Sequence, residues 1–385
     1  MPIRIEKPGP TVKQINGTDL QGIQVLSVIQ RVTYLRQPNG SLERAPEQTP
    51  LVDEPLADDN RHLLADCDLF PLKPKTDVVI LGHAYGRGRS QFDVSIHVNE
   101  KLTKRIRAIG DRSCASLGDG KILFSPPAPV DKIPLSYKYA YGGTDTIAEA
   151  ASAHFWVSFP KERNLEAAEK SLLNPFCYPR NPIGRGYIMD LTTDAVNQLT
   201  LPNLEDPLDL LTPDRLAVGH PGEWFKMPLP QATEWVYHNW FPRFAHLGIH
   251  IGMNEEPKNL AEVERGYSPP NIWQLRRPTP EDAFAFTCGA SLGLQLPHFR
   301  GGEVIRLENM HPKEPRVEYR LPKEQPKIWI DGRKGTMKQT EPVIQSVIIE
   351  PDIDRVSVIW RGSASAIRPY MPEELQKMPL RVEWA

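Results

Sequence analysis

The stretch PLKPKTDVVILGHAYGRGRSQFDVSIHVNEKLTKRIRAIGDR, residues 71–112, carries the clearest strand pattern of the chain. Residues 76–81 form a nearly unbroken apolar run rich in Val and Ile, which is typical of a strand covered on both faces. After a Gly-rich connection at 86–90, apolar and polar residues alternate over 92–98, so one face of a strand is buried there. Residues 102–109 alternate again. We therefore expect three consecutive strands in a small antiparallel meander.

Strand patterns continue on both sides of this stretch. Residues 24–35 are rich in Val, Ile, Thr and Tyr, and the turn at 37–40 ends in Asn-Gly, which predicts a hairpin. Residues 133–141 are expected to form a strand with tyrosines on one side, and 178–264 to form a long irregular cover, because prolines interrupt it. Further strands are expected at 304–307, 317–321, 327–330, 343–349 and 356–360, the last two forming a hairpin. Short helices are expected at 162–173 and from Thr279 to about Gly289.

Composition places the chain in the mainly β class. The 39 prolines and 26 glycines break 385 residues too often for long helices, while 40% hydrophobic and 24% charged residues are typical of a folded chain. We expect an antiparallel β-sandwich or a strongly curved sheet with long Pro-rich loops and a few short helices. Residues 1–22 are expected to be an extended N-terminal arm, 23–365 one β-rich domain, and 366–385 a tail. The alternative is two packed β subdomains, divided near 150–270.

Charge and cysteine usage exclude several classes of partner. A formal charge of −2 and a pI near 6.6 give no general attraction to nucleic acid or to an anionic membrane. The first residues lack the apolar core of a signal peptide, and no run approaches the length of a membrane span, so a cytoplasmic location is expected. The four cysteines, Cys67, Cys114, Cys177 and Cys288, have no metal-ligand spacing. Neither a metal nor a cofactor is expected.

Short motifs rich in Gly, Asn, Arg and acidic residues are distributed along the chain. They are KTDVVILGHAY (75–85), KRIRAIGDR (104–112), YGG-D (141–145), NPIGRGY (181–187), LPNLEDP (201–207), FPRF (241–244) and FRGGEVIRLENM (299–310). Gly suits tight turns, Asn and Asp suit turn caps, and Arg bridges loops through several hydrogen bonds. We expect an architectural role for His83, Tyr85, Gly110, Asp111, Arg112, Gly142, Gly143, Asp145, Asn181, Pro182, Gly184, Arg185, Gly186, Asn203, Glu205, Pro242, Arg243, Gly301, Gly302, Glu303, Arg306, Glu308 and Asn309.

In their order, these motifs resemble the signature of a bacterial family named only as a domain of unknown function. That family is typically encoded in type VI secretion clusters beside VgrG and PAAR-repeat spike proteins, and its studied members act as effector adaptors or chaperones. The resemblance implies a binding role. The implied partners are a secreted toxin effector and, in addition, a VgrG or PAAR protein. It supplies no catalytic residues.

An enzymatic alternative remains open. His83, Tyr85 and Asp111 stand at strand ends, where a His/Asp/Tyr cluster is conceivable, although a histidine there more often bonds a loop carbonyl. The candidates for the carboxylate pair of a glycoside hydrolase are Glu205, Asp206, Glu303 and Glu308. There is no GxSxG elbow and no phosphate loop ending in GK[ST]. The alternative function is a hydrolase acting on a glycan or peptide.

Two groups of residues are candidates for partner binding. A basic stripe consists of Lys101, Lys104, Arg105 and Arg107, continued by Arg112, and can face an acidic partner or be neutralised within the chain. An aromatic run consists of Trp224, Phe225, Trp235, Tyr237, Trp240 and Phe241. Such aromatics form either a cover over the core or a surface patch, and their burial decides between the two.

Overall fold

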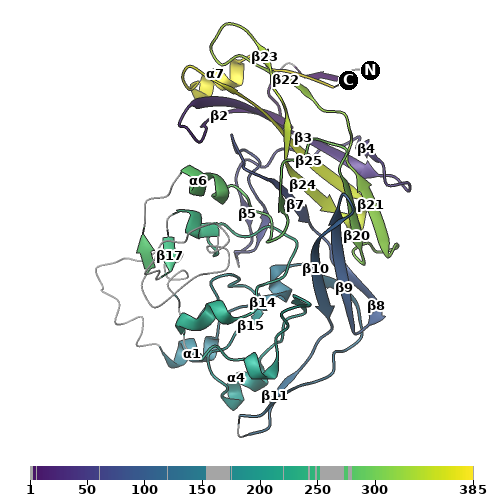
Figure 1. Ribbon diagram of the computed structural model, residues 1–385, viewed down its shortest axis with the longest axis vertical. Coiled ribbons are helices and arrows are strands. Elements are labelled where there is room, and N and C mark those ends of the chain that lie inside the picture. The colour runs from purple at the N-terminus through teal and green to yellow at the C-terminus, as the bar shows by residue number, and fades with distance from the viewer. Residues whose placement is uncertain are drawn as a thin grey trace.

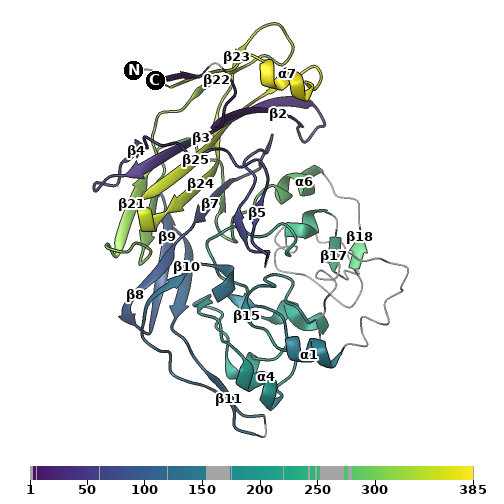
Figure 2. The same cartoon turned by 180° about the vertical axis from the view of Figure 1, so that it is seen from behind.

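The computed structural model describes residues 3–5, 7–59, 61–118, 120–152, 174, 176–219, 221–241, 243–247, 249–251, 273–275 and 280–384. These residues form a mainly β structure of several sheets with short helices, as predicted (Figure 1). Apart from the helix near the C-terminus, the helices and most irregular loops lie together on one side of the larger sheets (Figure 2).

The largest sheet has seven strands and joins both ends of the sequence. It contains β2 (Val12–Thr18), β3 (Gln24–Arg36), β4 (Leu42–Arg44), β7 (Thr76–Ile80), β19 (Gln295–Leu296), β24 (Val343–Glu350) and β25 (Arg355–Ser365). The order is β19-β7-β24-β25-β3-β2, with β4 paired to β3. The β3–β4 and β24–β25 hairpins confirm the sequence prediction. Strand β7 is buried along its whole length and runs parallel to β24.

A five-stranded sheet packs beside it in the order β16-β10-β9-β20-β21. Its strands are β9 (Gln91–Val98), β10 (Lys101–Ile109), β16 (Leu204–Glu205), β20 (Val304–Glu308) and β21 (Arg316–Arg320). The β9–β10 hairpin is as predicted. The prediction of a three-stranded meander is wrong, because β7 belongs to the seven-stranded sheet. Most of the expected Gly-rich connection is strand β8 (His83–Arg89), which pairs with β13 (Val130–Pro134).

Both ends of the chain are part of the folded structure. The four-stranded sheet contains β1 (Ile3–Ile5), β22 (Lys327–Ile330), β23 (Lys338–Gln339) and β26 (Arg381–Trp384). In it β1 pairs with β26, so the two termini lie side by side (Figure 1). The expected N-terminal arm is wrong for 12–18, which pair with β3 as strand β2. The expected C-terminal tail is also wrong, since it forms α7 (Pro372–Lys377) and β26.

The remaining elements are short. The two-stranded pairs are β5 (Leu56–Ala57) with β6 (Leu63–Ala65), β11 (Cys114–Ser116) with β12 (Ile122–Phe124), β14 (Tyr141–Gly142) with β15 (Arg185–Gly186), and β17 (Ile249–Ile251) with β18 (Trp273–Leu275). The other α-helices are α1 (Thr146–Ala151), α4 (Thr193–Gln198) and α6 (Pro280–Phe286). The 3-10 turns are η1 (Tyr137–Tyr139), η2 (Pro213–Arg215), η3 (Pro221–Lys226), η4 (Arg243–Leu247) and η5 (Pro351–Ile353).

Two sequence predictions for these elements need comment. The tyrosines expected on a strand are instead carried by η1 and the start of β14, because β13 ends at Pro134. Helix α6 begins at the predicted proline and ends at Phe286, three residues before Gly289. The helix expected at 162–173 lies outside the described residues.

The apolar side chains form two cores. The main core joins the sheets and includes Val79, Ile96 and Trp360. A second core lies among the short helices and loops around Tyr178 and Trp224. Because apolar burial is the main favourable term in folding, both the sheets and the loop-rich part have their own source of stability.

Candidate functional site

The outer face of the five-stranded sheet is lined by charged side chains, which we call the charged face. Strand pairing places them in rows across the sheet, since directly paired residues point to the same side. One row contains Arg105 of β10, Ser95 of β9, Glu308 of β20 and Arg316 of β21. The neighbouring rows contain Arg107 beside Asp93, and His97 beside Arg306 and Glu318.

A shallow groove of about 610 Å³ crosses this face. It is lined by Arg89, Gln91, Phe92, Asp93, Ser95, Arg105, Arg107, Glu308 and Asn309. Three of these residues are arginines and two are acids, and Phe92 is the one large apolar residue among them. The Arg89 guanidinium covers that ring at 4.7 Å from its centroid. The groove is therefore suited to polar groups of a partner.

Asn309 joins the groove to the adjacent loops. Its backbone is left-handed, with φ of 58°, and its side chain donates to the Asp93 carbonyl while accepting from Arg89. The Asn309 carbonyl accepts from the backbone N–H of Tyr85 on β8. Asn tolerates this backbone region better than most residues. Asn309 thus links the end of β20 to β8 and β9 through hydrogen bonds.

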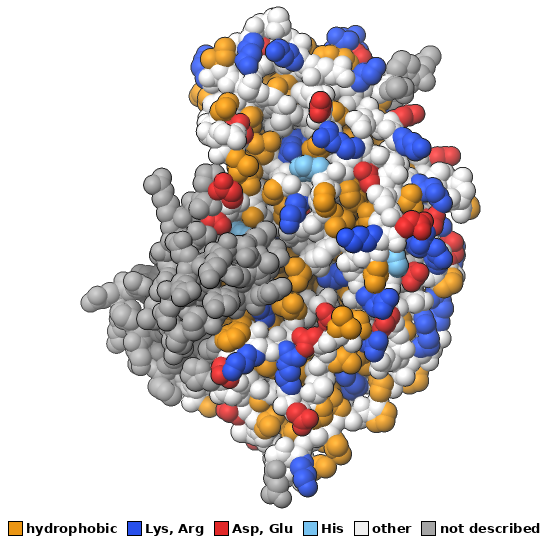
Figure 3. Space-filling view, in the orientation of Figure 1, with side chains coloured by type: hydrophobic (Ala, Val, Ile, Leu, Met, Phe, Trp, Pro, Cys, Tyr) orange, Lys and Arg blue, Asp and Glu red, His pale blue; other side chains and the backbone are white. Residues whose placement is uncertain are grey.

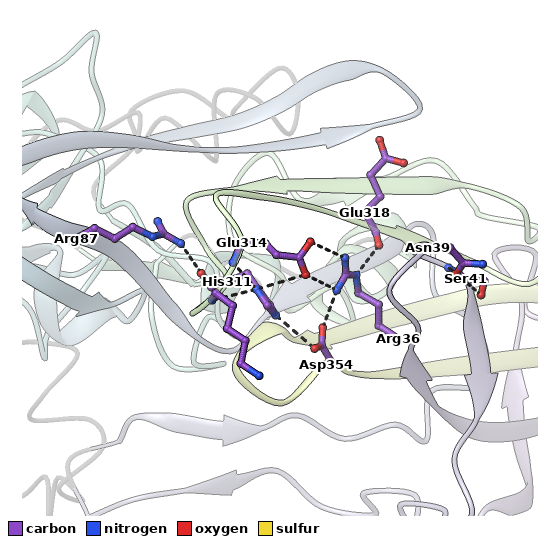
Figure 4. Close-up of polar contacts among 9 residues, drawn as sticks. Arg36, Asn39, Ser41, Arg87, His311, Glu314, Glu318 and Asp354 are labelled. Carbon is purple, nitrogen blue, oxygen red and sulfur yellow. Dashed lines mark hydrogen bonds and ion pairs between the residues drawn. The ribbon is translucent and has the colours of Figure 1, made fainter.

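A cluster of ion pairs lies at the turn between β24 and β25 (Figure 4). Arg36, at the end of β3, contacts the Glu314 carboxylate at 3.0 Å and the Asp354 carboxylate at 3.3 Å. His311 lies 3.4 Å from Asp354 and is almost fully buried, and its carbonyl accepts from Arg87 of β8. The contact with Arg36 lowers the pKa of the Glu314 carboxyl. This cluster connects the seven-stranded sheet to the loop that joins β20 and β21.

The same turn also holds His83. The Nδ1 atom of His83 lies 2.6 Å from one Asp352 oxygen, and the Tyr85 hydroxyl donates to the other at 2.9 Å. Burial, followed by this hydrogen bond, raises the pKa of Tyr85 to about 12. The expected cluster with Asp111 does not form in this way, since Asp111 instead accepts from Asn203. Among the described residues, no Ser, Thr or Cys hydrogen-bonds to His83.

The predicted basic stripe is only partly on the surface. Lys104 is buried, at 8% exposure, and its Nζ donates to the Leu292 carbonyl at 2.6 Å. Burial lowers the pKa of Lys104 to about 8. Arg107 is paired with Asp93, and Arg112 with Glu205. The stripe is therefore wrong for Lys104, which alternates in phase with the buried residues Ile106 and Ala108 and so faces the interior.

The motifs YGG-D and NPIGRGY meet where β14 and β15 pair in parallel. Gly142 and Gly143 have φ of +149° and +101°, and a Cβ on Gly142 would lie 2.2 Å from the Asn181 carbonyl oxygen. Asn181 is fully buried and donates to the Tyr137 and Tyr141 carbonyls. Gly184 and Gly186 also leave no room for a side chain, and Pro182 lies in the turn between them and Asn181. These residues are needed so that two backbones can approach closely.

The other motif residues also make contacts within the chain. Asp145 caps the N-terminus of α1, and Gly110 faces the Ala128 carbonyl. The Asn203 side chain accepts a hydrogen bond from the Arg185 guanidinium. Glu303 accepts from the backbone N–H groups of Arg300 and Gly301, in a turn where Gly301 and Gly302 have positive φ. Buried Arg243 pairs with Asp66. Pro242 lies outside the described residues.

The aromatic run is mostly interior. Trp224, Trp235, Trp240 and Phe241 are all buried, with Trp235 and Trp240 at 2% exposure. Phe225 and Tyr237 are half-buried and pack against the cores. The prediction of an exposed aromatic patch is therefore wrong for the four buried residues, which instead cover the core. Proline-rich loops over a sheet bring their aromatics inward, because these carry the largest apolar area.

A family model described as "Uncharacterized protein conserved in bacteria (DUF2169)" matches residues 21–361. The chain belongs to this family. No curated protein and no solved structure matches the chain. The match to the DUF2169 family covers the five-stranded sheet, the loop-rich part and the seven-stranded sheet except β2 and the end of β25. The charged face therefore lies within the matched residues.

Two other kinds of site are absent from the described residues. None of the helices there is long and apolar enough to cross a membrane. In the same part of the chain, no three His, Cys, Asp or Glu side chains are grouped to hold a metal ion.

Sequence reasoning missed several residues of the site. Asp352, Asp354, His311, Glu314 and Arg36 come from three distant segments, and only the fold brings them together. The acids of the turn at 351–354 were recognisable as hairpin residues, but their partners were not.

Proposed function

We propose that this protein is a cytoplasmic adaptor of a type VI secretion system, which holds a toxin effector and assists its loading on the VgrG or PAAR spike. The motif resemblance supports a binding role. The single observation that carries the proposal is the sheet surface around β10, which combines the charged face with exposed leucines.

Three exposed leucines belong to segments that meet at β10. Leu102 is on β10 itself, Leu208 follows β16, which pairs with β10, and the Leu292 carbonyl accepts from Lys104 of β10. Leu208 is 95% exposed. Specific interfaces combine an apolar centre with a polar rim and bury about 1,200–2,000 Å². The leucines can supply apolar contacts at the β16–β10 edge of the sheet. Of the three, Leu102 pairs with His97 and adjoins the charged face, whereas the Leu292 carbonyl meets Lys104 on the opposite side of the sheet.

The test is co-expression of the tagged chain with the effector, VgrG and PAAR genes of its own cluster, followed by affinity purification near physiological salt. One effector or spike protein should co-purify in a stoichiometric amount. Leu208→Asp should reduce this recovery, whereas Leu117→Asp should not, because Leu117 is also exposed, at 61%, but lies on the separate β11–β12 hairpin. Recovery of the chain alone would refute the adaptor role.

The hydrolase alternative makes a different prediction. Under it, His83→Ala and Glu303→Gln would abolish turnover of a glycan or peptide and leave the fold intact. The contacts of both residues favour the opposite outcome, since His83 holds the β24–β25 turn and Glu303 holds the turn before β20. Thermal unfolding of the two variants separates the alternatives.

A further inference from the structure

Most cations of the charged face already have partners. Arg107 is held by Asp93, and Arg306 by Glu318 and Glu100. Arg89 donates to the Tyr85 and Gly86 carbonyls and to Asn309. Arg105 and Arg316 differ, because they are exposed and make no ion pair with any of the residues that the structure describes. The face therefore keeps two cations available.

These two cations stand in one row of the sheet. Arg105 pairs with Ser95, Ser95 with Glu308, and Glu308 with Arg316. Ser95 is 5% exposed and forms the floor of the groove between its neighbours. Three strand spacings separate the two arginines, which is about 14 Å. In Figure 3 the blue and red side chains are intermixed on the right-hand side, toward the strands of this sheet.

We propose that this row binds an extended acidic segment of a partner protein, with one carboxylate at Arg105 and a second, four residues further on, at Arg316. An extended chain advances about 3.4 Å per residue, so residues i and i+4 are about 14 Å apart and point to the same side. The segment is a protein segment rather than a nucleic acid, because Asp93 and Glu308 would repel a continuous row of phosphates. This inference rests on the proposed adaptor function and identifies the surface that serves it.

The test uses the full chain and a fluorescein-labelled peptide with the core Asp-Ser-Thr-Ser-Asp, in fluorescence anisotropy at low and at physiological salt. The same peptide with both aspartates replaced by asparagine is the ligand control. Arg105→Glu and Arg316→Glu should each weaken binding of the Asp peptide about fivefold to tenfold, and salt should weaken it as well. Lys377→Glu, an equal charge change on exposed α7, should alter binding less than about twofold.

Three results would overturn the inference: equal binding of the Asn peptide, an equal effect of Lys377→Glu, or tighter binding of a single-stranded oligonucleotide. Absence of measurable binding would overturn it as well. The arginine variants are also carried through the co-purification described above. Partner recovery that persists in both variants refutes this surface but leaves the adaptor function standing. Selective peptide binding by a chain that recovers no partner refutes the adaptor function instead.

Discussion

Replacing Lys104 by Met should stabilise the protein at neutral pH. The buried ammonium has a pKa of about 8 instead of 10.5, so the folded state holds its proton less tightly than the unfolded state. At pH 7 this difference corresponds to roughly 3 kcal/mol of lost stability. Methionine fills the same space without a charge, but it removes the hydrogen bond to Leu292, which is worth about 1 kcal/mol. The net gain expected at pH 7 is about 2 kcal/mol.

The pH dependence gives the sharper test. Between pH 8 and 10.5 the unfolded chain keeps a proton on Lys104 that the folded chain has lost, so the stability of the wild type rises with pH in this interval. The advantage of Lys104→Met should therefore fall to about 1 kcal/mol at pH 9 and to about zero by pH 10. Urea unfolding followed by tryptophan fluorescence at four pH values measures this. Lys101→Met, an exposed neighbour on the same strand, is the control and should show no such trend. A destabilised Lys104→Met variant at pH 7, or an advantage independent of pH, would refute the assignment of a buried charge.

Three other changes test separate parts of the fold. Gly142→Ala should lower the free energy of unfolding by about 3 kcal/mol or more, because its Cβ would enter the neighbouring backbone, and Gly9→Ala is the control, with open space around it. Asp352→Asn should shift the titration of Tyr85 below pH 12, as measured by alkaline difference absorbance; an unchanged titration would show that burial alone sets this pKa. Trp235→Ala should cost about 3–5 kcal/mol in thermal or urea unfolding, whereas a folded variant of normal stability would return this residue to the partner-binding candidates.

Local patterns in the sequence predicted most strands, and their limits are physical. Alternation of apolar and polar residues over 92–98 and 102–109 identified the β9–β10 hairpin. Such alternation arises because one face of each strand is exposed to solvent and the other is buried. The same kind of pattern cannot tell which sheet a strand joins. Strand β7 looks like a neighbour of β9 in the sequence, but it pairs with β24, about 270 residues away. Sheet membership depends on such distant pairings.

The site was less predictable than the fold for the same reason. His83 was recognised as unusual, but its partner Asp352 is 269 residues further along the chain. Proximity in the sequence put Lys104 beside Arg105 in a basic stripe, but Lys104 alternates in phase with the buried residues Ile106 and Ala108 and therefore faces inward. The aromatic run could be assigned to the surface or the core only after the packing of the loops was known.

The pairing of β3 with β25 determines when this protein can fold. Residues 25–35 are paired with residues 355–365, so the long apolar strand β3 gains its central neighbour only after about 320 further residues have been made. At about 5–20 residues per second, the ribosome needs roughly 15–65 s to synthesise the intervening segment. During that time β3 can pair only with β2 and β4. The edge of β3 that later pairs with β25 is unpaired and can form a sheet with other nascent chains. Productive synthesis of this protein therefore depends on β3 being kept from aggregating until β25 has emerged from the ribosome.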